Sequence, residues 1–244
     1  MAETVNIQSM RERVAKACRV LGKLQLTTSM RGHISARLPE SDTLLIRARG
    51  PGEAGVRFTS AEDVITIDLD GNKLDGRDDQ EPPMEFFIHT WLYRTRPEIH
   101  AVLHAHPSTV VLFTICNKPL EPLFGAYDPS CLRLLSQGIS TYPRSVLISN
   151  NDLGREFAEA ANHGQACLMR GHGITTCGSS VEETTLTAIK LNELADINYR
   201  ANLLGNAEPI PPDELASFTP SKTGTDPYDA PLWRYYCRLL GEDS

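Results

Sequence analysis

A three-layer α/β/α fold, built around a central mixed but largely antiparallel sheet, is predicted from the order of the elements in this chain. Helical and strand patterns alternate along the 244 residues, and the early strands are short and separated by tight turns, so they are expected to pair antiparallel. The helices of the second half must then cover the faces of that sheet. No linker or repeat divides the chain, so residues 1–206 are expected to form one domain, and residues 207–244 a C-terminal tail that packs on it or on a neighbouring subunit.

Each element has its own local signal. Apolar residues at helical spacing, with polar caps, prolines or glycines at the ends, predict helices over 8–24, 82–97, 107–116, 150–164 and 179–205. Short runs rich in β-branched and apolar residues predict strands over 32–38, 43–48, 55–60, 100–106, 145–149 and 166–173. Asp70-Gly71 inside 64–74 predicts a hairpin turn. Residues 207–226 are rich in proline and are expected to be irregular, and an aromatic segment follows at 231–240.

Composition excludes several classes of protein. The net charge of −7 argues against nonspecific binding to nucleic acid or to an anionic membrane. No run approaches the roughly 18 apolar residues that a membrane span needs, and the first residues are polar where a signal peptide would be apolar. The six cysteines include no C-x-x-C pair and read as reduced thiols. A cytoplasmic protein is therefore expected.

Two histidines at alternate positions end a buried strand pattern in "VLHAHPSTVV". Residues two apart on a strand face the same side, so His104 and His106 present two imidazoles together. Pro107 ends the strand and leaves the pair at its open end. Such a pair can bind one cation. The alternative interpretation is a strand-end pair that hydrogen-bonds to water or to the backbone.

A third ligand is expected from "MRGHGITT". His172 lies there between two glycines at the end of a strand pattern, where glycine permits positive φ or a close approach of the backbone. Three histidines with one open position are typical of a catalytic metal site rather than of a closed structural one. His100 and His163 are weaker candidates, because one adjoins a turn and the other follows a helix.

An acid or base is expected on the helix before the histidine pair. Glu85 and His89 lie one turn apart on a helix that is otherwise apolar. They are either an ordinary surface pair or a carboxylate buried for chemistry. If Glu85 lies near a cation, its protonation state becomes usable in catalysis.

The combination of Glu85, an H-x-H pair nineteen residues later and a distant R-G-H-G resembles the class II aldolase/adducin family. The likeness runs from Met10 to Leu204. The stretch "RGHISAR" looks like the family's G-N-x-S turn, "VITIDLDGNKLDG" like its central hairpin, and "MEFFIHTWLYRTRPEIHAVLHAHP" like its signature segment.

The resemblance implies a class II aldolase-like fold and one divalent metal ion per subunit, held by His104, His106 and His172. Zinc is expected first, with manganese, iron and cobalt as alternatives. Glu85 matches the acid/base residue of the family's aldolases, which in some members also contacts the metal. Members are commonly homotetramers with the site at a subunit interface, so Tyr235 of a neighbour is a candidate for substrate binding, with plain subunit packing as the alternative.

The sequence departs from the family's sugar-phosphate aldolases at the phosphate cradle. His33 stands where the asparagine of G-N-x-S would be, Pro83 and Met84 replace a Ser-Ser pair, and no T-G turn follows Phe58. Phosphate binding needs several converging donors. An unphosphorylated substrate is therefore expected.

Imidazole and guanidinium groups remain near that cradle. Four arginines share these early strands and loops: Arg37, Arg47, Arg49 and Arg57. Arginine suits planar carboxylates, although most of the four are expected to be solvated strand edges. Ser35 and Arg49 are predicted to bind substrate, and His33 is a second candidate for proton transfer. A histidine after the glycine looks closer to the family's decarboxylases of dihydroxyphthalate or hydroxypyridine-dicarboxylate type.

The leading hypothesis is a metal-dependent carbon–carbon lyase of aromatic catabolism that decarboxylates an ortho-hydroxylated aromatic (di)carboxylate such as a dihydroxyphthalate. The metal would act as Lewis acid, and Glu85 or His33 as proton donor. The alternative is a class II aldolase that cleaves a hydroxy-keto acid or a sugar phosphate. A second alternative is a non-catalytic, adducin-like interaction module. The expected partners are a small anionic substrate and further copies of the chain.

Overall fold

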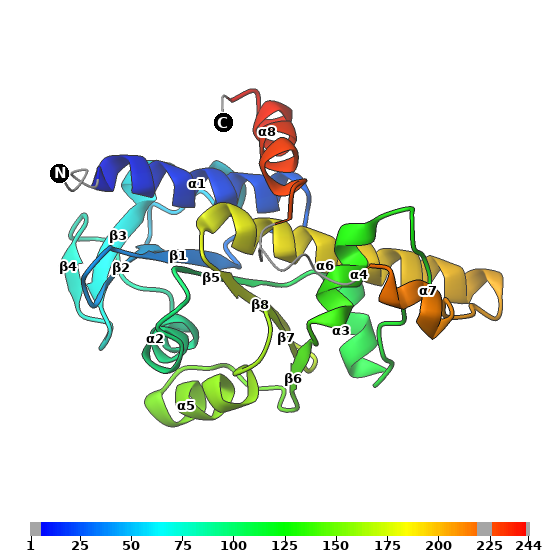
Figure 1. The fold of residues 1–244 in the computed structure, drawn as a ribbon. Helices are drawn as coiled ribbons and strands as arrows, with labels where there is room; N and C mark the ends of the chain where they lie inside the picture. The colour runs from blue at the N-terminus through cyan, green and yellow to red at the C-terminus, as the bar shows by residue number, and fades with distance from the viewer. Residues whose placement is uncertain (1–5, 219–225, 243–244) are drawn as a thin grey trace.

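The computed structural model of the chain describes residues 6–218 and 226–242, in which one eight-stranded sheet lies between two layers of helices (Figure 1). The strand order is β4-β3-β2-β1-β5-β8-β7-β6, and neighbours run antiparallel except β6 and β7. The strands are β1 His33–Arg37, β2 Thr43–Arg47, β3 Val64–Asp68, β4 Lys73–Asp75, β5 Ala101–Ala105, β6 Ser140–Tyr142, β7 Ala166–Met169 and β8 Gly173–Gly178. The predicted mixed, largely antiparallel α/β fold is confirmed.

The two faces of the sheet carry different helices. One face is covered by α1 Ile7–Lys23, α3 Ser108–Ile115, α4 Pro129–Ser136, α6 Val181–Leu204 and α8 Asp229–Leu240, and the other by α2 Phe86–Thr95 and α5 Asn151–Ala160 (Figure 1). A short helix, α7 Pro212–Ala216, follows α6. Alternate residues of β5 enter the two cores, Leu103 on the α1/α6 side and Val102 on the α2/α5 side. Among the described helices, none has the length and apolarity to cross a bilayer.

The hairpin predicted at Asp70-Gly71 joins β3 to β4. The amide of Asp68 donates to the carbonyl of Asn72 at 3.1 Å, and the amide of Gly71 donates back to the carbonyl of Asp68 at 3.1 Å. Gly71 has φ +86°, which only glycine adopts without strain. This hairpin forms the outer edge of the sheet, far along the strand order from β7 and β6.

The strand predicted over residues 55–60 is wrong, because this segment turns. Val56–Phe58 forms a short 3₁₀ helix, η1. Gly55 before it has φ +99°, and the amide of Val56 donates to the carbonyl of Ser29 at 2.8 Å. The backbone of this segment therefore hydrogen-bonds to the loop before β1, and it does not pair with a neighbouring strand.

The strand predicted over residues 145–149 is also wrong. The strand of this region is β6, which ends at Tyr142, directly before Pro143. Proline has no amide proton to continue a ladder. The amide of Ile148 donates instead to a carboxylate oxygen of Glu85, at 2.9 Å. The backbone of this segment thus holds a side chain of the site.

Two further boundaries differ from the predicted ones. The run 166–173 splits, because β7 ends at Met169 and His172 lies in the turn to β8, a strand that sequence patterns did not predict. The helix expected from residue 82 begins only at Phe86, so Glu85 precedes it as its cap residue. Both shifts place a polar side chain at the end of an element, where it is free to face a neighbour.

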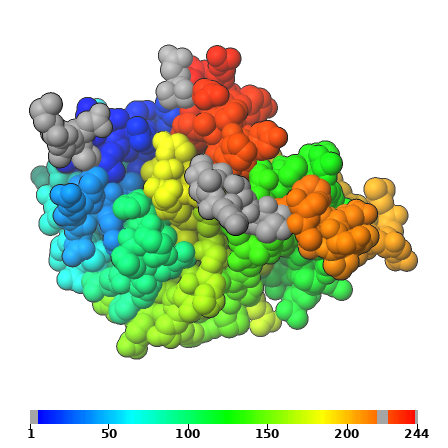
Figure 2. All heavy atoms as spheres, in the orientation of Figure 1, coloured from blue at the N-terminus to red at the C-terminus, as the bar shows by residue number. Residues whose placement is uncertain are grey.

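The C-terminal segment includes α8, which packs on α1 and α6 of its own chain. Figure 2 shows α8 on the surface beside these two helices. Lys190 of α6 forms ion pairs with Asp229 at 2.6 Å and with Asp226 at 3.1 Å, which fix the start of α8. The expected irregular stretch 207–226 contains α7, and its residues 219–225 lie outside the described part of the chain.

Candidate metal centre and active site

His104 lies in a row of paired residues that crosses three neighbouring strands of the sheet. His33 of β1, His104 of β5 and Thr175 of β8 are direct partners in the sheet register. Residues directly opposite one another on antiparallel strands point to the same face. That face is the one beneath α2, because Val102, two residues before His104, belongs to the α2/α5 core. His104 is completely buried there.

The other two histidines of the predicted set approach His104 from adjacent turns. The Nε2 atoms of His106 and His104 are 2.8 Å apart, and the ring centroids of His172 and His104 are 4.9 Å apart. The two glycines around His172 act as expected. Gly171 has φ +59°, and a Cβ on Gly173 would lie 2.3 Å from the carbonyl oxygen of Ala105. The turn can therefore press His172 against the end of β5.

Glu85 completes the group from the start of α2. One carboxylate oxygen, Oε1, accepts the hydrogen bond from the amide of Ile148. The other, Oε2, lies 3.4 Å from Nε2 of His172 and 3.6 Å from Nε2 of His104. The carboxylate is thus anchored on one side and directed at the imidazoles on the other. We call Glu85, His104, His106 and His172 the histidine–glutamate cluster.

The histidine–glutamate cluster fits a divalent cation. Its four ligand atoms all lie within 4.8 Å of one another. Two imidazole nitrogens bound to one zinc ion at 2.0–2.1 Å in a tetrahedral site are about 3.3 Å apart, so the 2.8 Å between Nε2 of His104 and Nε2 of His106 is within a small adjustment of that geometry. Three nitrogens and one oxygen form a donor set that zinc and the neighbouring transition metals accept.

A second group of buried side chains adjoins this cluster. Nδ1 of His33 lies 2.6 Å from Nε2 of His89, and Nδ1 of His89 lies 2.7 Å from the hydroxyl of Ser35. That hydroxyl lies 2.9 Å from the phenol oxygen of Tyr93, which also donates to the carbonyl of Ser35 at 3.2 Å. We call these four residues the His33–Tyr93 chain. Ser35 is fully buried and its hydroxyl contacts His89; the substrate contact expected of it stays a prediction.

The fold and the cluster agree with one family. Residues 12–199 match the family described as Class II Aldolase and Adducin N-terminal domain, which is most of the chain. The chain belongs to this family. The resemblance inferred from the sequence motifs is confirmed, and class II aldolases use a divalent metal of the kind that the cluster fits.

Curated members of the family narrow the class of enzyme. A 3,4-dihydroxyphthalate decarboxylase of Arthrobacter keyseri is 40% identical over 212 residues, 84% of this chain and 84% of the relative. One from Terrabacter sp. (strain DBF63) is 35% identical over 95% of this chain and 97% of its own length. The protein is thus an enzyme, a carbon–carbon lyase, as the sequence predicted.

Solved structures of the family support the fold. An L-fuculose 1-phosphate aldolase from Glaciozyma antarctica PI12 superposes with a TM-score of 0.82 at 19% identity, covering 100% of this chain and 96% of that one. An aldolase II superfamily protein from Pseudomonas syringae gives 0.84 at 21% identity, covering 98% and 94%. These likenesses concern the fold alone.

The electrostatics of the class II aldolase-like site suit metal ligation. Burial alone would raise the pKa of Glu85, but the hydrogen bond from His172 and the electrostatic effect of the adjacent His104 imidazole lower it to about 2. Burial lowers the pKa of His104 well below its usual value and, with the charge of His172, lowers that of His106 to about 4. At neutral pH these two imidazoles are neutral and the carboxylate is ionised, the forms that bind a metal.

Two predicted substrate residues lie apart from the histidine–glutamate cluster within one chain. The Arg49 guanidinium pairs with Glu81 at 2.6 Å and donates to the carbonyl of Pro82 at 2.9 Å, and none of its contacts among the described residues is with the cluster. Tyr235 lies on α8, across the sheet from α2, and is 56% exposed. A direct substrate contact from Arg49, or from Tyr235 of a neighbouring subunit, stays a prediction.

Arg47 has a structural role that its sequence position did not reveal. Its guanidinium is buried, pairs with Glu53, and donates to the carbonyls of Met30 at 3.1 Å and Gly32 at 3.0 Å. These carbonyls lie in the loop directly before His33. Arg47 therefore fixes the approach of that loop to the site and is not free for an anionic substrate.

Arg31 is a functional candidate that sequence reasoning missed. It is exposed, and in the part of the chain that the structure describes it forms no ion pair. It lies two residues before His33, whose ring centroid is 5.2 Å from that of His104, and its positive charge adds to the effects of burial and of His172 that lower the pKa of His106. A sequence signal could have indicated Arg31, because Arg31-Gly32-His33 repeats the Arg-Gly-His order of residues 170–172, which contain the candidate ligand His172.

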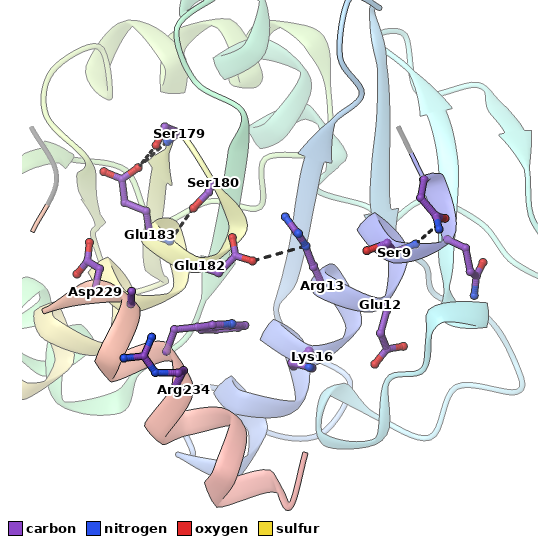
Figure 3. A pocket seen from close by; sticks show the side chains of 14 residues that line it. Ser9, Glu12, Arg13, Lys16, Ser179, Ser180, Glu182, Glu183, Asp229 and Arg234 are labelled. Carbon is purple, nitrogen blue, oxygen red and sulfur yellow. Dashed lines mark hydrogen bonds and ion pairs between the residues drawn. The ribbon is translucent and has the colours of Figure 1, made fainter. Parts of the chain in front are cut away.

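A separate hollow of about 920 Å³ lies between α1, the start of α6 and α8 (Figure 3). Charged side chains of both signs line it. Arg13 and Glu182 face one another across it at 3.9 Å, and Glu183 bonds to Ser179 and Ser180 (Figure 3). It contains no histidine and lies on the opposite face of the sheet from Glu85 and His104. The histidine–glutamate cluster is therefore the candidate site for the chemistry.

Proposed function

We propose that this protein is a metal-dependent decarboxylase of an ortho-hydroxylated aromatic dicarboxylate, a dihydroxyphthalate being the first candidate. The observation that carries the proposal is the convergence of Glu85 with His104, His106 and His172 beside a further buried histidine, His33. The 3,4-dihydroxyphthalate decarboxylases that resemble the chain over most of its length support the same substrate class.

His104, His106, His172 and Glu85 are the residues that would hold the ion, one per subunit, with zinc as the first expectation and manganese, iron or cobalt as alternatives. When bound, a divalent ion supplies Lewis-acid stabilisation of negative charge on substrate oxygens. The remaining chemistry belongs to side chains. Loss of carbon dioxide leaves an electron pair on the ring carbon, which must receive a proton.

Glu85 and His33 are the two candidates to move that proton. Oε2 of Glu85 faces the imidazoles and is ionised at neutral pH, so it must first take a proton before it can give one to the ring. His33 lies in the same cross-strand row as His104, with the ring centroids 5.2 Å apart. Either group is close enough to the cluster to act on a substrate bound there.

The substrate's anionic groups need cationic or polar partners. Arg31 is exposed and near the cluster, and we propose that it binds a substrate carboxylate. Arg49 and Tyr235 are retained as candidates, the second through a homotetramer with the site at a subunit interface. The same proposal places the enzyme in the cytoplasm and in the catabolism of aromatic compounds.

A panel assay tests the proposal. Purified protein loaded in turn with zinc, manganese, iron(II) and cobalt is incubated with dihydroxyphthalates, hydroxypyridine-dicarboxylates and sugar phosphates, and the release of carbon dioxide and of aldehyde is measured. We expect carbon dioxide from a dihydroxyphthalate with one or more of the metals. Aldehyde release from a sugar phosphate, with no carbon dioxide from any aromatic acid, would favour the aldolase alternative.

The aldolase alternative rests on the same cluster, because one electrophilic centre and Glu85 also suit cleavage of a hydroxy-keto acid. It is weaker because His33, Pro83 and Met84 stand where phosphate-binding side chains are expected. The second alternative, a non-catalytic adducin-like module, predicts no metal in the purified protein and no activation by added metal. Metal analysis by mass spectrometry decides that point.

A further inference from the structure

The His33–Tyr93 chain has a direction that determines how His33 faces the substrate. The chain runs from the cluster into the core beneath α2, and its imidazoles and hydroxyls are buried. A neutral imidazole carries one proton, so one ring nitrogen donates a hydrogen bond and the other accepts. Burial lowers the pKa of His89 to about 3, so His89 is neutral at working pH. Each hydrogen bond along the His33–Tyr93 chain therefore joins one donor atom to one acceptor atom.

The Tyr93 end of the path favours one direction of hydrogen-bond donation. The phenol of Tyr93 lies 3.2 Å from the carbonyl oxygen of Ser35 and 3.4 Å from that of His100. Carbonyl oxygens only accept, so the single phenol proton lies toward them. The phenol oxygen must then accept the proton of the Ser35 hydroxyl, 2.9 Å away. The reverse order would leave the phenol oxygen facing two carbonyl oxygens with no proton between them.

The remaining protons follow from that end. Because the Ser35 hydroxyl donates to Tyr93, its oxygen accepts from Nδ1–H of His89 at 2.7 Å. Nε2 of His89 then carries the lone pair and accepts from Nδ1–H of His33 at 2.6 Å. The proton of His33 is thus held on Nδ1. Its Nε2 is left as an acceptor, with no hydrogen-bond partner among residues 6–218 and 226–242.

We propose that His89, with Ser35 and Tyr93 behind it, is a positioning residue that holds His33 in the Nδ1–H tautomer and so presents an unprotonated Nε2 to the substrate. The part of this inference that concerns substrate rests on the proposed function. There, Nε2 of His33 accepts a hydrogen bond from the ring hydroxyl of an ortho-hydroxylated aromatic acid. In this tautomer that nitrogen has no proton to give, so of the two candidates Glu85 delivers the proton to the ring carbon. A substrate oxygen without a proton gains nothing from this nitrogen, so the chain selects for the hydroxylated ring.

The tautomer is measured directly by nitrogen-15 NMR of the zinc-loaded, full-length protein, with the His33 signals assigned by their loss in His33→Gln. We expect a pyrrole-like Nδ1 and a pyridine-like Nε2 on His33. A proton on Nε2 overturns the proposal. This measurement needs no turnover, so it stands whether or not any substrate of the panel is decarboxylated. A failure of the panel assay with the expected tautomer would count against the proposed function alone.

Variants within the His33–Tyr93 chain provide a second test of the proposal. Tyr93→Phe removes the oxygen that orients Ser35, and we expect mixed His33 tautomers and a kcat lower by about threefold to tenfold per bound metal, with KM changed by less than twofold. His89→Gln should keep the His33 tautomer and the kcat of the unmodified protein, since the glutamine amide oxygen can accept from His33 and its NH₂ can donate to Ser35. The matched control is Tyr142→Phe, a buried tyrosine in the same apolar layer and outside the chain.

The outcomes separate a positioning role from a merely structural one. A structural role would lower the melting temperature or the metal content of Tyr93→Phe without changing the His33 tautomer or the kcat per bound metal. The positioning role of the His33–Tyr93 chain is refuted if Tyr93→Phe changes neither the His33 tautomer nor the kcat per bound metal. It is also refuted if Tyr142→Phe lowers kcat as much as Tyr93→Phe does. If Tyr93→Phe does not fold, the tautomer of the unmodified protein and of His89→Gln still decides the proposal.

Discussion

Two groups of histidines, both built around buried imidazoles, lie on one face of the sheet and differ in what their ring nitrogens contact. In the histidine–glutamate cluster, the ring nitrogens converge on one another and on a single carboxylate oxygen. In the His33–Tyr93 chain, each nitrogen on the path has its own partner, and the path ends on backbone carbonyls. Convergence of lone pairs is the signature of a cation site, whereas a path of single donors and acceptors fixes proton positions.

The largest effect is expected from removing one imidazole of the cluster. His172→Ala should lose the metal and lower activity by more than about 100-fold, because changes even to the partners of metal ligands cost 10–100-fold. Metal content by mass spectrometry and the rate of carbon dioxide release check this together. His163→Ala, which removes an exposed histidine outside both groups, is the control. Full metal occupancy in His172→Ala would contradict the ligand set.

Glu85→Gln tests the acidic member of the same cluster. The side-chain amide oxygen of glutamine can still accept the hydrogen bond from the amide of Ile148, and the three imidazoles remain, so the variant should fold and retain metal. Turnover should fall by about 10²–10⁴, because the amide cannot transfer a proton. Single-turnover kinetics at equal metal content measure the loss. Turnover equal to that of the unmodified protein would remove Glu85 from proton transfer.

The pH dependence of stability should report the buried, neutral state of the His33–Tyr93 chain. The folded-state pKa of His89 is lowered to about 3, against about 6.5 in an unfolded chain. Its contribution to the free energy of unfolding is therefore complete above about pH 6.5 and is lost as the pH falls toward 3. We measure the free energy of unfolding of the metal-free protein by urea titration between pH 7 and 5. For this group we expect it to fall by up to about 1.4 kcal/mol for each unit by which the pH is lowered.

His89→Gln is the comparison for that pH series. Glutamine does not titrate, so the variant should show a shallower loss of unfolding free energy on acidification. Parallel curves for the two proteins would mean that His89 becomes protonated in the folded state, contrary to the burial of its ring.

The smallest effect is expected outside both groups, at Arg49. Its ion pair with Glu81 is exposed, and such pairs contribute about 0–1 kcal/mol. Arg49→Gln should therefore change the free energy of unfolding by less than about 1 kcal/mol, measured by urea titration. If Arg49 also binds substrate, as the sequence predicts, KM rises while kcat stays near its original value. An unchanged KM would leave the arginine with its structural contacts alone.

Much of the site followed from local sequence signals. Alternate positions on one strand placed His104 with His106, and flanking glycines indicated that His172 was held for a purpose. Glu85 stood out as a carboxylate in an apolar segment. The missing parts depend on contacts between distant segments. His33 and His89 are 56 residues apart, and Ile148, which anchors Glu85, is 63 residues beyond it.

The sequence by itself determined the fold class, the three histidines and the glutamate of the candidate site and the departure from the phosphate cradle, because strand alternation, glycine conformation and residue chemistry are local properties. Only the tertiary structure decided that Ser35 acts through His89, that Arg47 holds the loop before His33, and that α8 lies across the sheet from the site in its own chain. Hydrogen-bond directions and the choice of face arise from the register of β1 against β5 and the packing of α2 over them, which no local pattern encodes.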